Sequence, residues 1–574
     1  MKKLQTILLA AVMLLCLCAC GKDTAPALSG AGTAEAPYRI STAGELRKMA
    51  ELINEEDTGE IYGAAHYLLT ADIELSTSPE WIPIGTEKMP FQGVLDGDGH
   101  TVSGIRIHYR EPLAGQPQRY FGFFGKIQGG TVRDLTISNS ALRAEGDGSV
   151  EVAAVAAYVR DGILENCRVT STVSVTSNYH AAGICASLNG ESILRGCTNA
   201  ASVTATGTVG TAAGIVVRAE PLVEHCANEG PILSEGDAAG IANTANGGLA
   251  DCRNEGAVTA SNGYAAGVVC RFGDGALNHR ENDDTVTLLR CVNTGDVLSA
   301  SDPAGGIAVR CSTGHLVDCV NRGNVTSPME AGGIFAYFNQ SVFGAACERF
   351  TVTGCVNSGA VTNSQNAAIY SVGGICGILY ASDTDHVFEN CTNSGPIFSG
   401  EAAGGIIGSC DGQDIRLLGC VNSGAVTGVG VCGGIVGDAA PCAGEDTEEI
   451  LFIAENCRNE GEVYVARDGL NFGGTILLDS YAGGILGRLM HLPTEPDFTQ
   501  VRIADCENTG RLDGEDADTH FWRHDLCGSW ADAEAQRKKE RIFRSFFCLG
   551  QITTGRISCP AGHGSNPCGC TTDG

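Results

Sequence analysis

Aromatic side chains are scarce in this sequence. Phe, Tyr and Trp together make up 6% of the 574 residues, and tryptophan occurs only at Trp81, Trp522 and Trp530. Large aromatic rings supply much of the contact area at binding sites. The composition therefore disfavours a cleft that holds sugar rings between many aromatic platforms.

Positive charge is scarce as well. Lys and Arg number 37 against 67 Asp and Glu, so the formal net charge is −30. A surface of this sign repels phosphate backbones, and we expect no nucleic acid partner. It favours solubility and is suited to recruiting calcium.

Apolar runs long enough to span a membrane are missing. One short run, Ile7 to Leu15, follows Met1-Lys2-Lys3 and leads into Leu17-Cys18-Ala19-Cys20. A basic start, a short apolar core and small residues at a cleavage point are typical of a secretory signal. An ordinary signal peptide that happens to end in cysteine is one interpretation.

The tetrad Leu-Cys-Ala-Cys resembles the lipobox of bacterial lipoproteins, in which the last cysteine becomes the N-terminus and carries the lipid. This resemblance implies that residues 1–19 are a signal peptide and that Cys20 is the lipid attachment site. Residues 20–36 would then be a flexible tether. We expect a membrane partner through the lipid, and a location in the cell envelope outside the cytoplasm.

Cysteine is abundant, with 27 residues in total and 24 once Cys16, Cys18 and Cys20 are set aside. Such a number in an exported protein normally indicates disulfides. The spacing of the cysteines indicates an internal repeat instead. The signature is Cys-x-Asn-x-Gly-x-aliphatic, as in Cys226-Ala-Asn228-Glu-Gly230-Pro-Ile232. Its cysteines are residues 167, 197, 226, 252, 291, 319, 355, 391, 420, 457 and 506.

A second signature precedes most of these cysteines. It reads Ala-Ala-Gly-Ile from residues 181, 212 and 238, and Gly-Gly-Ile from residues 305, 332, 373, 404, 433 and 483. Units of 26 to 49 residues with short β-branched runs and polar turns predict a solenoid of stacked parallel strands. We expect an all-β, right-handed parallel β-helix with three short strands per coil and a length of roughly 60–70 Å.

The Cys, Asn, Gly and aliphatic positions are two residues apart, so a strand sends all of them to one face. We predict that this face is the interior. Cysteine then stacks on cysteine, and asparagine amides hydrogen-bond from coil to coil. Cβ atoms about 4.8 Å apart are too distant for a disulfide, which favours reduced, buried thiols. Gly-Gly before Ile indicates a tight corner.

The combination of Gly-Gly-Ile-x-Gly, at 373–377, 404–408, 433–437 and 483–487, with a following Asn-Cys and Gly-x-Val resembles the GLUG motif. That motif belongs to bacterial surface proteins with right-handed β-helices, and the resemblance covers roughly residues 37–512. Earlier coils depart from it, with Ala-Gly-Ile and no closing glycine. Some such proteins are proteases with a zinc domain, but no His-Glu-x-x-His occurs here. The resemblance implies the architecture and the surface location, and it says little about activity.

The ends of the repeat region are predicted to be caps. Residues 37–110 would hold an N-terminal cap and the first strands, with Thr42-x-x-Glu45 as a capping box before a helix that buries Leu46, Met49, Leu52 and Ile53. Residues 111–512 would be the β-helix. Residues 513–574 would form a small C-terminal cap, with a helix over 531–546, and a Cys/Gly-rich tail.

Two groups of residues are candidates for a metal. Asp96-Gly-Asp98-Gly-His100 fits either a calcium loop or a plain turn between strands. His520, His524 and Cys527 would share a helix face and suit a structural zinc. Disulfides between Cys527 and Cys548, or between Cys559 and Cys568 or Cys570, and an unpaired polar tail are the alternatives. No other cofactor is expected.

Insertions in the repeat give the clearest functional indication. Residues 271–290, 335–350, 378–389, 438–455 and 488–504 all lie between Gly-Ile and the next cysteine, so they should project from one edge. The predicted ligand-binding rim comprises Asp274, His279, Arg280, Glu281, Asp283, Asp284, Tyr337 and Phe338. Solvated loops without a function are the alternative.

Two functions from different classes are compatible with the sequence. The first, which we expect, is a non-catalytic surface rod for adhesion to an extracellular glycan, a matrix protein or an envelope component. The second is a polysaccharide lyase or glycoside hydrolase that would use Asp283, Asp284 and Arg280.

Overall fold

The computed structural model describes residues 28–518. It leaves out residues 76–78, 111–118, 147–148, 274–285, 340–346, 364–369, 381–383, 412–413, 441–449, 466–469, 473–474, 478–480, 490–498 and 514–516 within that range. The predicted signal peptide and Cys20, the C-terminal helix, the disulfide candidates and the candidate metal ligands His520, His524 and Cys527 lie outside the described residues.

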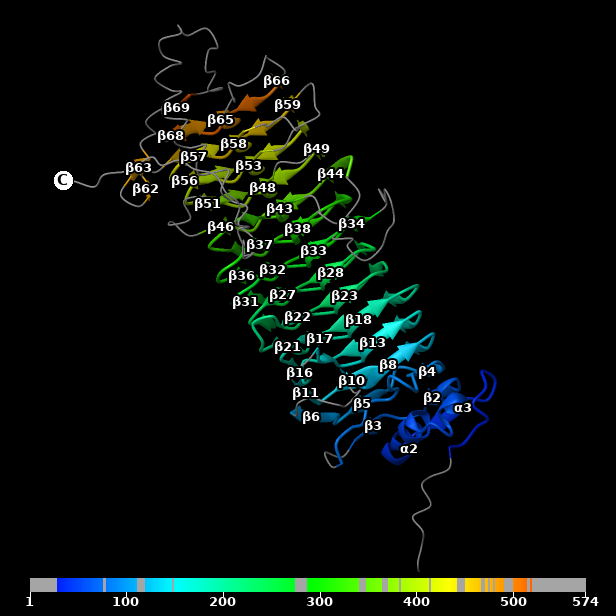
Figure 1. Ribbon diagram of the computed structural model, residues 1–574. Coiled ribbons are helices and arrows are strands. Elements are labelled where there is room, and N and C mark those ends of the chain that lie inside the picture. The colour runs from blue at the N-terminus through cyan, green and yellow to red at the C-terminus, as the bar shows by residue number, and fades with distance from the viewer. Residues whose placement is uncertain are drawn as a thin grey trace, which may run out of the picture. The chain divides into compact units, whose positions relative to one another are not determined.

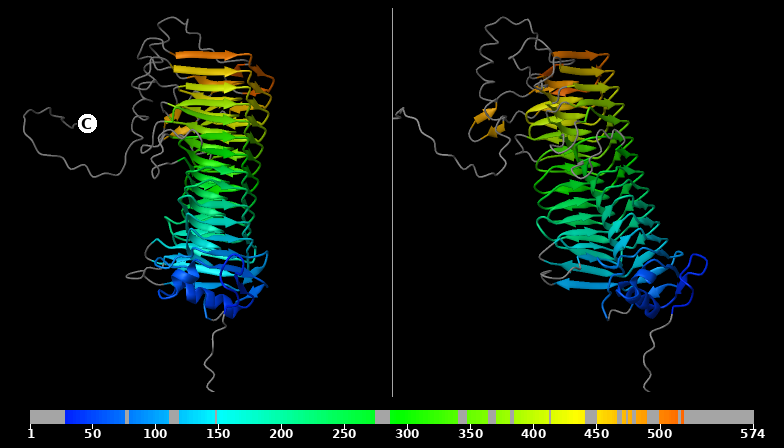
Figure 2. Two further views of the ribbon diagram at one scale, coloured as in Figure 1. Left: turned by 90° about the vertical axis from the view of Figure 1, so that its right-hand side faces the viewer. Right: turned by 45° about the vertical axis from the view of Figure 1, so that its right-hand side comes forward.

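The described chain is a right-handed parallel β-helix, as the repeats predict. Strands from successive coils form five long parallel sheets of 15, 14, 13, 13 and 12 strands, which we call sheets I to V in chain order (Figures 1 and 2). One coil runs through β14 (Ile163–Glu165), β15 (Arg168–Val169), β16 (Ser174–Ser177), β17 (His180–Ala182) and β18 (Cys185–Asn189). Fifteen strands in sheet I at about 4.8 Å spacing give a rod of roughly 65–70 Å.

Each coil has five strands rather than the predicted three because two sharp bends divide it further. The first bend separates sheet I from sheet II at the residue before each repeat cysteine. All eleven of these residues have positive φ, between 50° and 66°: Asn166, Gly196, His225, Asp251, Arg290, Asp318, Gly354, Asn390, Gly419, Asn456 and Asp505. Gly, Asn and Asp adopt this left-handed conformation with little strain, which explains the recurring Asn-Cys and Asp-Cys.

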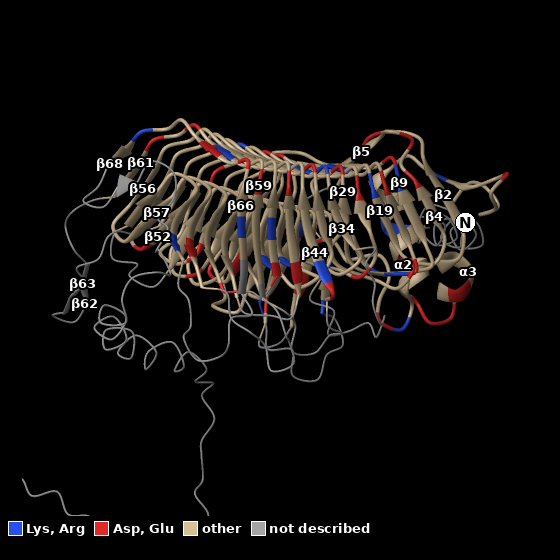
Figure 3. Ribbon diagram, turned by 90° about the horizontal axis from the view of Figure 1, so that it is seen from above, with Lys and Arg blue, Asp and Glu red and all other residues tan. Residues whose placement is uncertain are grey.

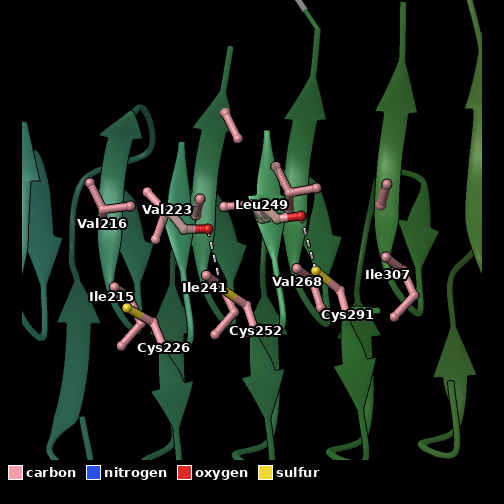
Figure 4. Close-up of a cluster of buried hydrophobic side chains, with 14 of the residues drawn as sticks. Ile215, Val216, Val223, Cys226, Ile241, Leu249, Cys252, Val268, Cys291 and Ile307 are labelled. Atoms are coloured by element: carbon pink, nitrogen blue, oxygen red, sulfur yellow. Dashed lines mark hydrogen bonds between the residues drawn. The ribbon is translucent and has the colours of Figure 1, made fainter. Parts of the chain in front are cut away.

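The repeat cysteines point into the core, as predicted. Those from Cys167 to Cys457 are buried and Cys506 is partly exposed; all are free thiols. Cys226, Cys252 and Cys291 follow one another from coil to coil beside branched aliphatic side chains (Figure 4). The Cys252 Sγ lies 3.6 Å from the carbonyl oxygen of Val223. These thiols therefore act as small apolar groups with a weak S–H donor.

Asparagines form the second predicted ladder. Nine hydrogen bonds of 2.7–2.8 Å join Nδ2 of one asparagine to Oδ1 of the next, from Asn199 to Asn508. Nδ2 also donates to the carbonyl two residues on, as from Asn321 to Gly323 at 2.9 Å. Each amide thus links two coils and closes a corner of its own coil.

The second bend lies between sheets IV and V, at the glycine before the repeat isoleucine. This glycine faces the asparagine ladder: a Cβ on Gly333 would lie 2.4 Å from Cγ of Asn357 and 2.1 Å from the carbonyl oxygen of Gly374. Ten coils repeat this contact, at 2.3–2.4 Å from the asparagine Cγ. The glycine of the Gly-Ile signature therefore packs directly against the asparagine of the Cys-x-Asn signature.

The N-terminal end is capped by helix α2 (Ala43–Asn54), as predicted. The Thr42 side chain accepts from the Glu45 amide, the Glu45 side chain accepts from the Thr42 amide, and Leu46, Met49 and Ile53 are buried. Leu52 is only partly buried. A short helix, α3 (Gly59–Gly63), follows. No helix among the described residues is long and apolar enough to span a membrane.

Candidate ligand-binding face

The structure tests two of the predicted rim residues. Tyr337 and Phe338 lie on β43 (Phe335–Phe338) of sheet V. Phe338 is fully buried, with its ring 4.7 Å from those of Phe350 and His386, so its predicted place on the rim is wrong. Tyr337 points outward and is 8% exposed.

The remaining rim residues, Asp274, His279, Arg280, Glu281, Asp283 and Asp284, lie outside the described residues. The predicted insertions are partly strand, because each range starts within a strand of sheet V and includes a strand of sheet I. The single edge expected for the residues between these strands stays a prediction.

The Asp96–His100 segment is a turn between β4 (Val94–Asp96) and β5 (Thr101–Ser103). Asp98 and Gly99 have φ of 48° and 78°, and the Asp96 carboxylate accepts from Arg133 at 2.6 and 2.9 Å. The turn interpretation is therefore correct. Across the part of the chain that the structure describes, no group of three or more His, Cys, Asp or Glu is placed to hold a metal ion.

A different surface gathers aromatic and charged side chains. Outside the core, where sheets IV and V meet, small residues are buried in a line along the rod, which we call the outer seam. Its floor in the first coils is Ala153, Ala182, Ala186, Ala213 and Val217, then Ala239, Ala266, Cys270, Val309 and Ala336. Later coils have Gly377, Gly408, Gly437 and Gly487, where a Cβ would come within 2.5–2.6 Å of backbone oxygens. This contact explains the closing glycine of Gly-Gly-Ile-x-Gly.

Three tyrosines form a cluster on the outer seam, which we call the tyrosine cluster. Tyr264 precedes β32 (Ala265–Ala266), Tyr337 lies on β43, and Tyr380 follows β48 (Cys376–Leu379). The hydroxyls of Tyr264 and Tyr337 share a hydrogen bond of 2.8 Å. Ring centroids are 6.2 and 5.8 Å apart along the series, with interplanar angles of 72° and 75°. Edge-to-face packing of this kind holds aromatic rings rigidly.

Charged groups fix the tyrosine cluster on both sides. The Arg271 guanidinium lies 4.8 Å from the Tyr264 ring centroid and is paired with Asp237. The Tyr380 hydroxyl donates to Glu330 Oε1 at 2.6 Å, and burial raises the pKa of Glu330. The cluster therefore holds two partly exposed rings, Tyr264 and Tyr380, on the nearly buried Tyr337, with hydrogen-bonding groups at their edges. A ligand with apolar faces and hydroxyl edges matches that arrangement.

The outward positions of sheet V are unusually basic for this chain. Register partners along the sheet are Lys126, Tyr158, Ser187, Arg218, Thr244, Arg271, Arg310, Tyr337, Ile378, Ser409, Asp438 and Arg488. They include five cations and one carboxylate, although acids outnumber bases overall. Facing them are Glu151 and Asp237 on sheet IV and Glu330 just before β42 (Ala331–Gly332), so the outer seam carries both charges side by side.

Sheet I offers a different surface. It carries charges of both signs (Figure 3), and one register row alternates from Asp96 through Arg133, Glu165 and Arg195 to Glu224. Ion pairs such as Arg133–Asp96 at 2.6 Å and Arg195–Glu165 at 2.8 Å link these coils. Exposed pairs of this kind contribute little to stability, typically about 0–1 kcal/mol each. Sheet I is therefore a solvated face, and it supplies control positions for tests of the outer seam.

An acidic group of residues, Glu401, Asp411 and Asp438, lies near the C-terminal end of the outer seam. Burial and the Asp438 charge raise the pKa of Glu401 to about 8 and that of Asp411 to about 7. Asp438 itself is paired with Arg488 at 2.5 and 3.0 Å. Two carboxyl groups that hold protons near neutral pH beside a charged one are the type of arrangement that acid catalysis uses.

An apolar pocket of about 300 Å³ lies near the N-terminal cap, lined by Trp81, Ile107, Tyr109 and Phe121 with Glu80 and His108 at its edge. Trp81 is 4% exposed and donates its indole N–H to the Phe123 carbonyl oxygen, so its ring is part of the hydrophobic core.

These features define a repeat protein of the parallel β-helix class with a long lateral surface. No family model matches the chain. A stretch of 130 residues is 32% identical to a protein of Evansella cellulosilytica assigned as a Gly-rich membrane protein, covering 22% of this chain and 13% of that protein. Another of 145 residues is 31% identical to halomucin of Haloquadratum walsbyi, covering 23% of this chain and 2% of halomucin. The chain thus matches only a small part of either relative.

Among solved structures, one assigned as an immunoglobulin A1 protease from Bacteroides ovatus aligns with 64% of this chain and 78% of its own length. The sequences are 19% identical and the TM-score is 0.26. A superposition this loose has no bearing on activity.

Proposed function

We propose that the chain is displayed at the cell envelope by a lipid on Cys20. The lipobox-like tetrad, the GLUG-like repeats and the local similarity to proteins named as a membrane protein and a halomucin support this location. Cys20→Ala should move the protein from the membrane fraction to the soluble fraction and abolish labelling by a clickable fatty acid. Unchanged labelling of Cys20→Ala would contradict the proposal.

We propose further that the rod binds an extended glycan along the outer seam without cleaving it. The observation that carries this function is the tyrosine cluster, with Arg271, Asp237 and Glu330 fixed beside it. Sugar rings present apolar C–H faces and hydroxyl edges, which match tyrosine rings edged by charged groups. The coil spacing of about 4.8 Å is also close to the length of one sugar unit, so equivalent positions on successive coils can meet successive sugars.

Binding of the full chain to a glycan array tests this function, with Tyr337→Ala as the informative variant. We expect about a tenfold or greater rise in Kd, because Tyr264 and Tyr380 pack on the Tyr337 ring and lose their fixed positions without it, and loss of an aromatic binding anchor typically costs about 1–2 kcal/mol or more. Tyr464→Ala is the control, since Tyr464 is 38% exposed on sheet III. Tyr337→Phe keeps the packing and loses only the hydrogen bond to Tyr264, so a smaller rise is expected. Equal Kd values for Tyr337→Ala and wild type would exclude the tyrosine cluster as the binding site. Binding to matrix proteins alone would exclude a glycan ligand.

A second function, glycan cleavage, is favoured by the acidic group of Glu401, Asp411 and Asp438. New reducing ends or unsaturated ends released from pectin, alginate or glycosaminoglycans, and lost in Glu401→Gln, would establish it. Bound glycan that stays intact supports the binding role instead.

A further inference from the structure

A second polar group lies on the outer seam, closer to the N-terminus than the tyrosine cluster. Glu151 on β12 (Glu151–Ala153) and His180 on β17 are register partners on adjacent coils of sheet IV. Arg218 on β23 (Val216–Ala219) approaches them from sheet V, with Nη2 3.4 Å from His180 Nε2 and 3.4 Å from the Tyr179 hydroxyl. We call these four residues the Glu–His cluster.

Two buried atoms of the Glu–His cluster lack hydrogen-bond partners. They are Oε2 of Glu151 and Nδ1 of His180, and the side chains are 12% and 4% exposed. His180 Nδ1 lies 3.8 Å from Glu151 Oε1, which is beyond hydrogen-bond distance. A buried polar atom without a partner costs about 1–3 kcal/mol. A ligand hydroxyl that donates to Glu151 Oε2 and accepts from His180 Nδ1–H would remove that cost.

Aromatic rings again accompany the polar atoms. The Tyr179 ring stacks on the His180 ring at 4.0 Å. Tyr120, the register partner of Glu151, lies 5.1 Å from Tyr158, over which the Lys126 ammonium is placed at 5.3 Å. Tyrosine, a cation and a carboxylate therefore recur together, as in the tyrosine cluster.

We infer that the Glu–His cluster is a second sugar-binding subsite and that one linear, neutral polysaccharide lies across both clusters. This inference rests on the proposed function and adds the class of ligand. The ligand should be neutral because cations on sheet V face carboxylates on sheet IV, and because the chain's net charge of −30 repels polyanions. It should be linear because equivalent positions of the outer seam follow one another from coil to coil along sheets IV and V.

The distance between the clusters sets the length of the ligand. His180 and Tyr264 are separated by three coil spacings on sheet IV, roughly 14 Å, and Glu151 to Tyr380 spans seven spacings, roughly 34 Å. A chain that reaches both clusters gains affinity because the second contact is intramolecular. Shorter oligomers occupy one cluster at a time.

Calorimetric titration of the full chain with cello-oligosaccharides, from dimer to decamer, tests the inference. Affinity should rise with length up to about seven units and then level off. In Glu151→Gln, which preserves shape, long oligomers should bind roughly tenfold more weakly, and short ones as in wild type. Glu165→Gln on sheet I is the control, and melting temperatures verify folding.

Each outcome bears on a different claim. Equal binding of long oligomers by Glu151→Gln and wild type would remove the second subsite while the proposed function stands. Tighter binding of polygalacturonate than of the neutral chains would overturn the assignment of a neutral ligand. No binding of any glycan by wild type would overturn the proposed function and this inference together.

Discussion

Replacing Asn321 with leucine should lower the free energy of unfolding by about 3–5 kcal/mol. Asn321 is fully buried, donates to Gly323 and Asn357 at 2.9 and 2.8 Å, and accepts from Asn293 at 2.8 Å. Leucine has a similar volume but removes all three hydrogen bonds. The Asn293 amide, the Asn357 oxygen and the Gly323 carbonyl would then be buried without these partners, and each such loss costs about 1–3 kcal/mol.

Thermal and denaturant unfolding measure this effect, with Asn324→Leu as the matched control in the same coil. Asn324 is exposed, and its amide donates to the Asp296 carboxylate at 3.0 Å, so the control should lose no more than about 1 kcal/mol. Because each coil contacts its neighbours, hydrogen exchange should quicken first in the coils on either side. If both variants were equally stable, the asparagine ladder would contribute nothing beyond filling space.

Replacing Gly333 with alanine should also be strongly destabilising and lower the free energy of unfolding by about 3 kcal/mol or more. The new methyl group would lie 2.1 Å from the Gly374 oxygen and 2.4 Å from Cγ of Asn357. Both neighbours are held by the ladders on either side, so relief requires a shift of backbone in two coils. Soluble yield and melting temperature measure the outcome, since this variant is expected to fold poorly.

Gly129→Ala is the control that separates the effect of the steric contact at Gly333 from the effect of replacing a glycine. Gly129 has φ of 77°, and a Cβ there would meet nothing within 4 Å, so the expected cost is only the left-handed strain of about 1–2 kcal/mol. A Gly333→Ala protein that is as stable as Gly129→Ala would show that the corner can open without penalty.

The error at Phe338 has a local cause. The sequence interpretation placed the insertion from residue 335, but β43 continues through Phe338 before the insertion begins. At each such strand of sheet V two consecutive residues face outward, here Ala336 and Tyr337, and the next returns to the core. A simple alternation of faces cannot anticipate that local departure from pleating.

The tyrosine cluster was missed for a different reason. Tyr264 and Tyr337 are 73 residues apart in sequence, and they meet because the coils between them stack in register. Coils vary from 26 to 49 residues, so no fixed spacing in the sequence marks positions that share one outward line. Glu151, His180 and Arg218 are brought together in the same way.

The sequence by itself determined the interior and the stacking. Cysteine, asparagine, glycine and aliphatic residues two apart must share a face, and only identical neighbours above and below can bury it. The tertiary structure alone decided the five-sheet cross-section and the side chains that meet on the outer seam. The interior repeats because every coil needs the same packing, whereas outward residues are free to vary, so their partners depend on the register of whole coils.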